Sequence, residues 1–174
     1  MDSRAKLAGH AIHPMLVVFP LGLLVTAFIF DIVSLIHGGP QWGVVSFWMI
    51  AAGIIGGVIA AIFGLIDWSA IPSGTRAKSV GVTHALGNVV VLVLFAVSWY
   101  LRRGHEEIPG TTPIVLAGIG VVIGAVTGWL GGELVERLGV SVHPGANINA
   151  PSSLSGAPVS TTTVEPADDL RRAS

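Results

Sequence analysis

Four long apolar segments separated by short polar stretches constrain this chain more than any other feature of its sequence. They run from about 13 to 36, 42 to 68, 80 to 101 and 114 to 138. Each is long enough to cross the hydrocarbon core of a bilayer as a helix, which takes roughly 20 apolar residues. Since only helices and closed barrels satisfy their backbone hydrogen bonds within lipid, the pattern predicts an all-α integral membrane four-helix bundle.

The composition agrees with a chain that has lipid as its solvent. Hydrophobic residues make up 52% and charged residues 11% of the sequence, whereas an ordinary soluble domain has roughly 25% charged residues. The formal net charge of −1 gives no overall field that would attract nucleic acid. Cysteine is absent, which excludes disulfides, thiolate clusters, a nucleophilic thiol and covalently attached haem. Any metal or cofactor must therefore be held by His, Asp, Glu or Met side chains.

Polar stretches at both ends divide the chain into three parts. Residues 1–11 are expected to be an interfacial N-terminus, 12–140 the four-helix transmembrane domain, and 141–174, rich in Pro, Ser, Thr and Ala, a disordered tail. The first apolar segment follows basic residues as in a signal peptide, but it is longer than the roughly 7–15 residues of such a segment. It is therefore interpreted as a retained transmembrane helix, in which Pro20 introduces a bend.

Small residues recur every four positions in the second and fourth segments, a spacing that lets two membrane helices approach closely. The second segment carries Gly53 and Gly57 in this arrangement. The fourth segment has the strongest such signal, which is interpreted as a buried helix contact. Its glycines are Gly120, Gly124, Gly128 and Gly132.

Basic residues near the ends of the segments predict the orientation of the bundle. The side that holds both termini has five of them and the other side has two. By the positive-inside rule, both termini are then cytoplasmic. The two arginines on the other side follow Trp99 and Tyr100, and they are expected to anchor the third segment at the membrane interface. The residues counted are Arg4, Lys6, Arg76, Lys78 and Arg137 against Arg102 and Arg103.

Most polar residues of the apolar segments fall at one end of the predicted bundle. His13 begins the first segment, Asp67 ends the second, His84 lies early in the third, and Glu133 lies near the end of the fourth. His84 is within reach of a His13 that points inward. Asp31 follows His13 by eighteen residues, which is roughly 27 Å of helix. It is therefore expected near the opposite surface, neutral or hydrogen-bonded, and outside this cluster.

Four sequence motifs combine these polar residues with glycine, proline and tryptophan. They are His13-Pro14-Met15-Leu16-Val17-Val18-Phe19-Pro20 with Asp31, Gly64-Leu65-Ile66-Asp67-Trp68, Thr83-His84-Ala85-Leu86-Gly87-Asn88 and Gly128-Trp129-Leu130-Gly131-Gly132-Glu133-Leu134-Val135. Over about residues 9–143, their order resembles the bacterial family catalogued as domain of unknown function 2231. The resemblance implies a small four-helix membrane protein, joined in some relatives to a Rieske-type iron–sulfur domain, and no established activity. Since this chain has no Rieske ligand set, such a redox partner would be a separate polypeptide.

Two histidines in separate helices suggest a cofactor. Imidazole is a haem ligand and helical bundles hold cofactors between facing helices. His13 and His84 are therefore candidate axial ligands of a non-covalent b-type haem in a redox-associated subunit. The alternative for His84 is an interhelical hydrogen bond, because Asn88 lies one turn later on the same face. The alternative for His13 is a simple position at the start of a helix beside the interface.

Two further functions are compatible with the sequence. One is a cofactor-free structural or anchoring subunit, which the glycine stripes favour because they specify helix contacts and no chemistry. The other is a proton or small-solute pathway through Asp31, Asn88, His84 and Asp67, although four spans are few for a transporter unless the protein forms a homo-oligomer. A hydrolytic enzyme is not expected, since the chain lacks H-E-x-x-H and G-x-S-x-G patterns.

Overall fold

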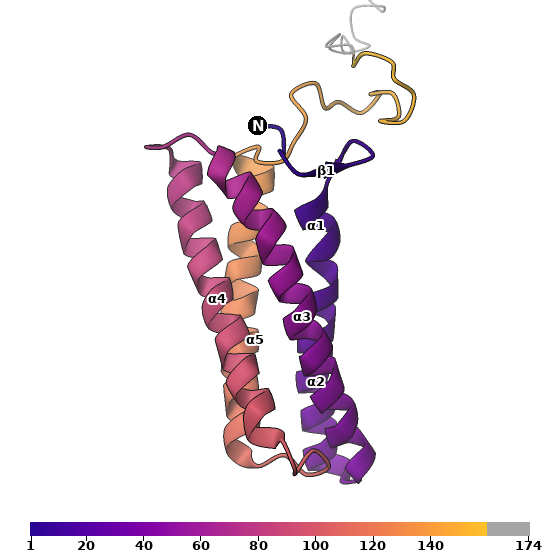
Figure 1. Ribbon diagram of the computed structural model, residues 1–174, viewed down its shortest axis with the longest axis vertical. Helices are drawn as coiled ribbons and strands as arrows, with labels where there is room; N and C mark the ends of the chain where they lie inside the picture. Colours follow the sequence, from indigo (N-terminus) through magenta and orange to yellow (C-terminus); the bar gives the residue numbers. More distant parts are fainter. Residues whose placement is uncertain (160–174) are drawn as a thin grey trace, which may run out of the picture.

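In the computed structural model, which describes residues 1–159, four long helices form an up-and-down bundle (Figure 1). All four are long and apolar enough to cross a membrane, so the predicted all-α membrane bundle is confirmed. The helix boundaries lie within a few residues of those expected. The first span consists of α1 (Ile12–Leu16) and α2 (Val18–His37), followed by α3 (Pro40–Ala70), α4 (Arg76–Arg102) and α5 (Thr111–Gly132), which continues into a π-helical turn, η1 (Glu133–Arg137).

Local sequence signals account for the helix ends. Pro20 has no N–H to donate to the carbonyl of Leu16, the residue at which α1 ends. The expected bend is therefore a short break between α1 and α2. Pro40 occupies the first turn of α3, where its missing N–H is not needed. The hydroxyl oxygen of Thr75 accepts the backbone N–H of Lys78 at 3.2 Å and caps the start of α4.

The four spans pair into two helical hairpins. α2 packs along α3, and α4 along α5, more extensively than the two hairpins pack on each other. The pairs lie side by side in Figure 1. The main apolar core lies between the two hairpins, halfway along the bundle. It forms a layer without polar side chains. Its buried members are Leu24, Ala27, Ile50, Val91, Phe95 and Ala117.

The second hairpin repeats the contacts of the first. Leu24 on α2 packs on Gly53 of α3, and Phe95 on α4 packs on Gly120 of α5. A residue of α4 therefore corresponds to the residue 71 positions earlier in the first span (95 minus 24). A residue of α5 corresponds to the residue 67 positions earlier in α3 (120 minus 53). In each hairpin, a glycine replaces a side chain where a bulky residue of the partner helix must approach.

Equivalent positions of the two hairpins also meet each other. In this register His13 corresponds to His84 and Asp31 to Arg102, and both pairs are in contact. Contact between equivalent positions is the property of a twofold arrangement. Because α2 and α4 also run in the same direction (Figure 1), these contacts indicate an approximate twofold relation between the two hairpins, with the axis along the bundle.

The N-terminal residues form a small hairpin over one end of the bundle. Strands β1 (Lys6–Leu7) and β2 (His10–Ala11) pair antiparallel and lead directly into α1. From 141 to 159 the chain forms turns and contains no helix or strand, and the hydroxyl of Ser153 donates to the carbonyl of Ala8 at 3.1 Å. The predicted disorder of the remaining tail, 160–174, lies outside the described residues.

Candidate functional site

Two imidazole rings meet where the hairpins face each other. His13 lies on α1 and His84 on α4. Their ring centres are 6.5 Å apart and their planes are nearly perpendicular, at 86°. Both side chains are partly buried. The structure therefore brings together the two candidate ligands that are separated by 71 residues in the chain.

Each histidine is fixed by the second helix of its own hairpin. Nδ1 of His13 lies 2.8 Å from the carbonyl oxygen of Ala60, and Nδ1 of His84 lies 2.8 Å from that of Thr127. A carbonyl can only accept, so in each neutral ring Nδ1 carries the proton and Nε2 keeps its lone pair. In metal-binding histidines, the ring nitrogen that does not bind the metal usually donates a hydrogen bond in this way.

Glycines make room for both rings. A Cβ atom on Gly64 would lie 2.9 Å from the ring of His13, and one on Gly131 would lie 3.1 Å from that of His84. Each glycine is one turn beyond the residue whose carbonyl accepts the Nδ1 proton. The rings can therefore lie directly against the backbone of α3 and α5.

His84 belongs to a further polar network that His13 lacks. The amide nitrogen of Asn88 lies 3.1 Å from Nε2 of His84 and donates to the His84 carbonyl at 2.9 Å. The hydroxyl of Thr127 donates to the Asn88 amide oxygen at 3.0 Å. In the first hairpin, the register places Val17 and Ala60 where the second has Asn88 and Thr127. The two halves of the site are therefore chemically unequal.

A buried ion pair occupies the other end of the bundle. Arg102 binds both carboxylate oxygens of Asp31, at 2.6 and 2.7 Å, and neither side chain has any exposed area. The guanidinium also donates to the hydroxyls of Ser46 and Ser98 and to the carbonyl of Pro113. The expectation that Arg102 anchors α4 at the membrane interface is therefore wrong, because its charge is neutralised inside the bundle.

Asp31 is hydrogen-bonded, which is one of the two states expected for it. Its partner, the guanidinium of Arg102, was not expected from the sequence. Asp31 lies apart from the histidines, as the helical spacing required, with the apolar layer of Leu24, Ile50 and Phe95 between the two polar regions. Among the described residues, an apolar segment thus separates the histidine region from the Asp31–Arg102 pair.

Asp67 and Glu133 have structural partners of their own. One carboxylate oxygen of Asp67 accepts the hydroxyl of Ser3 at 2.7 Å and the backbone N–H groups of Arg4 and Ala5 at 2.9 and 3.2 Å. The other oxygen is buried without a hydrogen-bond partner among the described residues. Glu133 pairs with Arg76 at 2.7 Å. Asp67 therefore holds the N-terminal segment, and Glu133 joins η1 to the start of α4.

Two carboxyl groups outside the spans have pKa values below their ordinary range. For Asp2, the main cause is the hydrogen bond that Lys6 donates to it. For Glu106, it is the backbone N–H of Gly104. Both groups are thus more firmly ionised than a free carboxylate, and neither contacts the histidine pair.

The glycine stripe of α5 contacts other helices only in part. Gly120 packs on Phe95, and Gly57 on α3 similarly approaches Leu92. At Gly124, Gly128 and Gly132, a Cβ atom would meet nothing within 4 Å among the described residues. The close helix contact predicted for these three glycines has no partner inside the bundle and stays a prediction.

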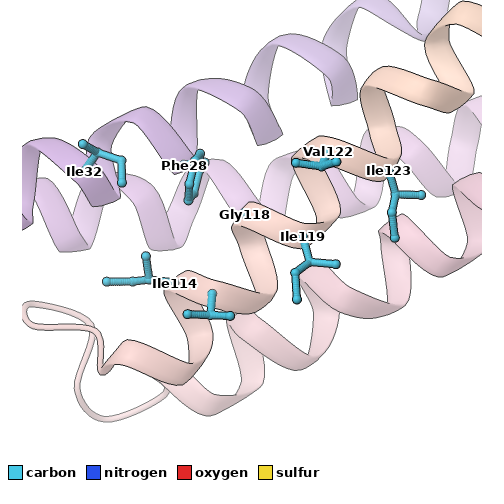
Figure 2. A pocket seen from close by; sticks show the side chains of 8 residues that line it. Phe28, Ile32, Ile114, Gly118, Ile119, Val122 and Ile123 are labelled. Carbon is cyan, nitrogen blue, oxygen red and sulfur yellow. The ribbon is translucent and has the colours of Figure 1, made fainter.

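An apolar groove of about 390 Å³ lies between α2 and α5 (Figure 2). Phe28 and Ile32 line it from α2, and Ile114, Gly118 and Ile119 are among its lining residues on α5. Its wall has no side chain that could orient a polar ligand, and neither histidine belongs to it. The groove is therefore separate from the histidine site.

Comparison with known proteins gives a family and no relative of known structure. A family model described as "Predicted membrane protein (DUF2231)" matches residues 9–144. No curated protein and no solved structure matches the chain significantly. The matched range includes both histidines, the Asp31–Arg102 pair and all four spans.

Proposed function

Since the chain belongs to the DUF2231 family of predicted membrane proteins, we propose that it is a redox-associated membrane subunit in which His13 and His84 bind one b-type haem. The observation that carries this proposal is the meeting of the two imidazoles at the approximate twofold axis. The absence of cysteine requires a haem held without thioether bonds.

The distances at the site support shared ligation. The ring centres lie 6.5 Å apart, which is close enough for both imidazoles to reach a single metal ion. Both Nδ1 atoms are occupied by carbonyls, which leaves the Nε2 atoms as the ligating nitrogens.

The chain's own residues would set the chemistry of this site. A bound haem would supply one-electron transfer, and the two histidines would fix its position. The carbonyls of Ala60 and Thr127 would fix the orientation of the two imidazole rings. His84 first has to release the amide of Asn88 from its Nε2. A Rieske-type or other redox protein bound in trans would complete the transfer.

An absorption spectrum of the purified full-length protein tests the proposal. We expect a Soret band whose position shifts or whose intensity falls in both His13→Ala and His84→Ala. His10→Ala is the matched control, because His10 is exposed in the N-terminal hairpin. A protein without a Soret band after expression with a haem precursor, or a band unchanged in both site variants, would contradict haem binding.

A cofactor-free anchoring subunit is the second candidate. It is favoured by Asp31 and Arg102, whose buried charges satisfy each other and join the two hairpins without any ligand. Co-purification of a partner in mild detergent, together with a colourless protein, would favour this function. A continuous proton pathway has less support, because the apolar layer around Phe95 separates the two polar regions.

The proposed location is the bacterial inner membrane with both termini cytoplasmic. Removing the buried Arg102 from the charge comparison leaves Arg103 as the basic residue at the opposite surface, so the asymmetry becomes larger. The chain contains no cysteine, so single substitutions can be labelled without background. We expect a membrane-impermeant thiol reagent to label His105→Cys in intact cells and Ser73→Cys only after lysis. The reverse pattern would overturn the orientation.

A further inference from the structure

The two interfaces between the hairpins occupy equivalent positions, but they are filled differently. In the interface of α3 with α4, the rings of Phe47 and Trp99 stack with their centres 5.2 Å apart. The equivalent residues in the interface of α2 with α5 are Ile114 and Phe28, which line the apolar groove of about 390 Å³ (Figure 2). The groove therefore lies where the other interface holds an aromatic pair.

A second pair of equivalent positions shows the same difference. A Cβ atom on Gly57 of α3 would lie 2.6 Å from the side chain of Leu92 on α4, so these two helices are in close contact. The equivalent residues are Gly124 and Leu21, and a Cβ atom on Gly124 would meet nothing within 4 Å among the described residues. Leu21 instead keeps 55% of its surface exposed. The interface of α2 with α5 thus lacks bulky contacts at two levels.

The groove has the width of a single hydrocarbon chain. Its lining on α5 runs from Ile114 to Ile123, which is about 13 Å of helix and gives a mean cross-section of about 30 Å². A helix with its side chains is about 10 Å wide or more and has a cross-section of about 80 Å², so it is too wide to enter. Carbon atoms in contact lie about 3.5–4.0 Å apart. The groove therefore admits one column of methylene groups.

The surroundings of the groove define the chemistry of its occupant. Its two walls belong to spans that are long and apolar enough to cross a membrane, so the groove faces the hydrocarbon of the bilayer. Every side chain drawn in Figure 2 is a hydrocarbon, and none could hold a polar group. These features match an acyl chain and exclude a lipid headgroup from the groove itself.

The groove lies at the level of the buried ion pair. Ile32, which lines it from α2, directly follows Asp31. Ile114, which lines it from α5, follows Pro113, whose carbonyl accepts an N–H group of Arg102 at 3.4 Å. An occupied groove would therefore complete the apolar surroundings of this pair on the side of α2 and α5.

We propose that this groove is a lipid site that binds one acyl chain of a membrane phospholipid. The acyl chain takes the place that the rings of Phe47 and Trp99 take in the other interface, and it keeps water away from the buried ion pair. A second copy of the protein is not the occupant, because a helix is too wide for the groove. The proposal does not depend on haem binding.

The number of bound lipids tests the site. The full-length protein is reconstituted in vesicles of phosphatidylethanolamine and phosphatidylglycerol, extracted into mild detergent and analysed by native mass spectrometry. Phe28→Trp with Ile114→Phe introduces the aromatic pair of the other interface, and we expect this variant to retain one phospholipid fewer than the wild type. Val126→Phe is the matched control, because Val126 is exposed on α5 outside the groove lining. Equal numbers in the wild type and the double variant would overturn the proposal.

A second measurement leaves the groove unfilled. Since the chain has no cysteine, a fluorescent label can be attached to Val122→Cys at the exposed rim of the groove and to Val93→Cys on the exposed face of α4. Phosphatidylcholine with brominated acyl chains quenches both labels in vesicles. After transfer to detergent, we expect the first label to stay quenched and the second to recover. Recovery of both labels would overturn the lipid site.

The oligomeric state in the same mass spectra tests the other occupant. A wild-type dimer that becomes a monomer in Phe28→Trp with Ile114→Phe, without loss of lipid, would assign the groove to a second copy and overturn lipid binding. A wild type and a double variant of the same oligomeric state that differ by one phospholipid for each protein chain would support it.

Discussion

Arg102 shows how one side chain can determine the packing of a membrane protein. A charge inside a bilayer is expensive, and this guanidinium has no exposed area. Asp31 neutralises it, and Ser46, Ser98 and the carbonyl of Pro113 accept further N–H groups. Because these partners come from α2, α3, α4 and the start of α5, the arginine joins all four spans at one end of the bundle.

Removal of only one charge should be much more damaging than removal of both. We expect Arg102→Leu to lower the free energy of unfolding by about 3–5 kcal/mol, since Asp31 would be left buried and unpaired. Asp31→Leu combined with Arg102→Leu should recover most of this loss. Thermal unfolding in detergent followed by circular dichroism measures both. A double variant as unstable as the single one would contradict the ion-pair interpretation.

Gly64 is expected to be intolerant of any side chain. A Cβ atom there would lie 2.9 Å from the ring of His13, and such overpacking typically costs about 1–3 kcal/mol. Gly64→Ala should therefore lower the melting temperature and displace His13. Gly128→Ala is the control, because a Cβ atom at Gly128 meets nothing within 4 Å. Equal melting temperatures for the two variants would refute the close approach.

At the scale of elements, the N-terminal segment behaves as part of the bundle. Asp67 accepts three hydrogen bonds from Ser3, Arg4 and Ala5 through one carboxylate oxygen. The N-terminal ammonium also donates to the carbonyl of Gly139 at 2.5 Å. These contacts place the segment between the end of α3 and the chain beyond η1, and the carbonyl of Ala5 accepts the backbone N–H of Ile12 at the start of α1.

Trypsin should detect release of this segment. We expect Asp67→Leu to increase the rate of cleavage after Arg4 and Lys6 about tenfold or more, since hydrogen bonds to a charged acceptor contribute about 1.5–3 kcal/mol each. Asp67→Asn keeps one carbonyl oxygen as the acceptor and should be cleaved more slowly than Asp67→Leu. Mass spectrometry of the fragments gives the rates, and equal rates for both variants would show that the segment is not held through this oxygen.

At the scale of the molecule, the bundle consists of two related hairpins with opposite charges at equivalent positions. Asp31 in the first hairpin and Arg102 in the second meet beside the approximate twofold axis. Two identical hairpins would place like charges in contact there. The pair therefore favours association of the first hairpin with the second over association of either with a copy of itself.

Exchange of the two charges tests this arrangement. We expect Asp31→Arg with Arg102→Asp to be more stable than either single substitution by about 1–3 kcal/mol, the usual coupling between contacting residues. It should remain below the wild type, because Ala27 stands where the first hairpin would need the equivalent of Ser98. Adding Ala27→Ser should raise its melting temperature. A charge-exchanged protein no better than the worse single variant would contradict the approximate symmetry.

Much of the candidate site followed from residue spacing. Periodicity and length placed His13, His84 and Asn88 at one end of the bundle and Asp31 at the other, because rise per residue in a helix is fixed. The Asp31–Arg102 pair was missed, since an arginine after Trp99 and Tyr100 resembles an interface anchor. A signal was present in the chain, as Arg102 follows His84 by the same eighteen residues that separate Asp31 from His13.

The sequence by itself determined that this protein is a four-helix membrane bundle, because lipid leaves a long apolar segment no other way to satisfy its backbone. It also determined the depth of each polar residue along its helix. Only the tertiary structure decided which helix faces meet, because rotation about the helix axis depends on side-chain packing between segments distant in the chain. That packing brings His13 to His84, and it turns Arg102 away from the membrane surface and onto Asp31.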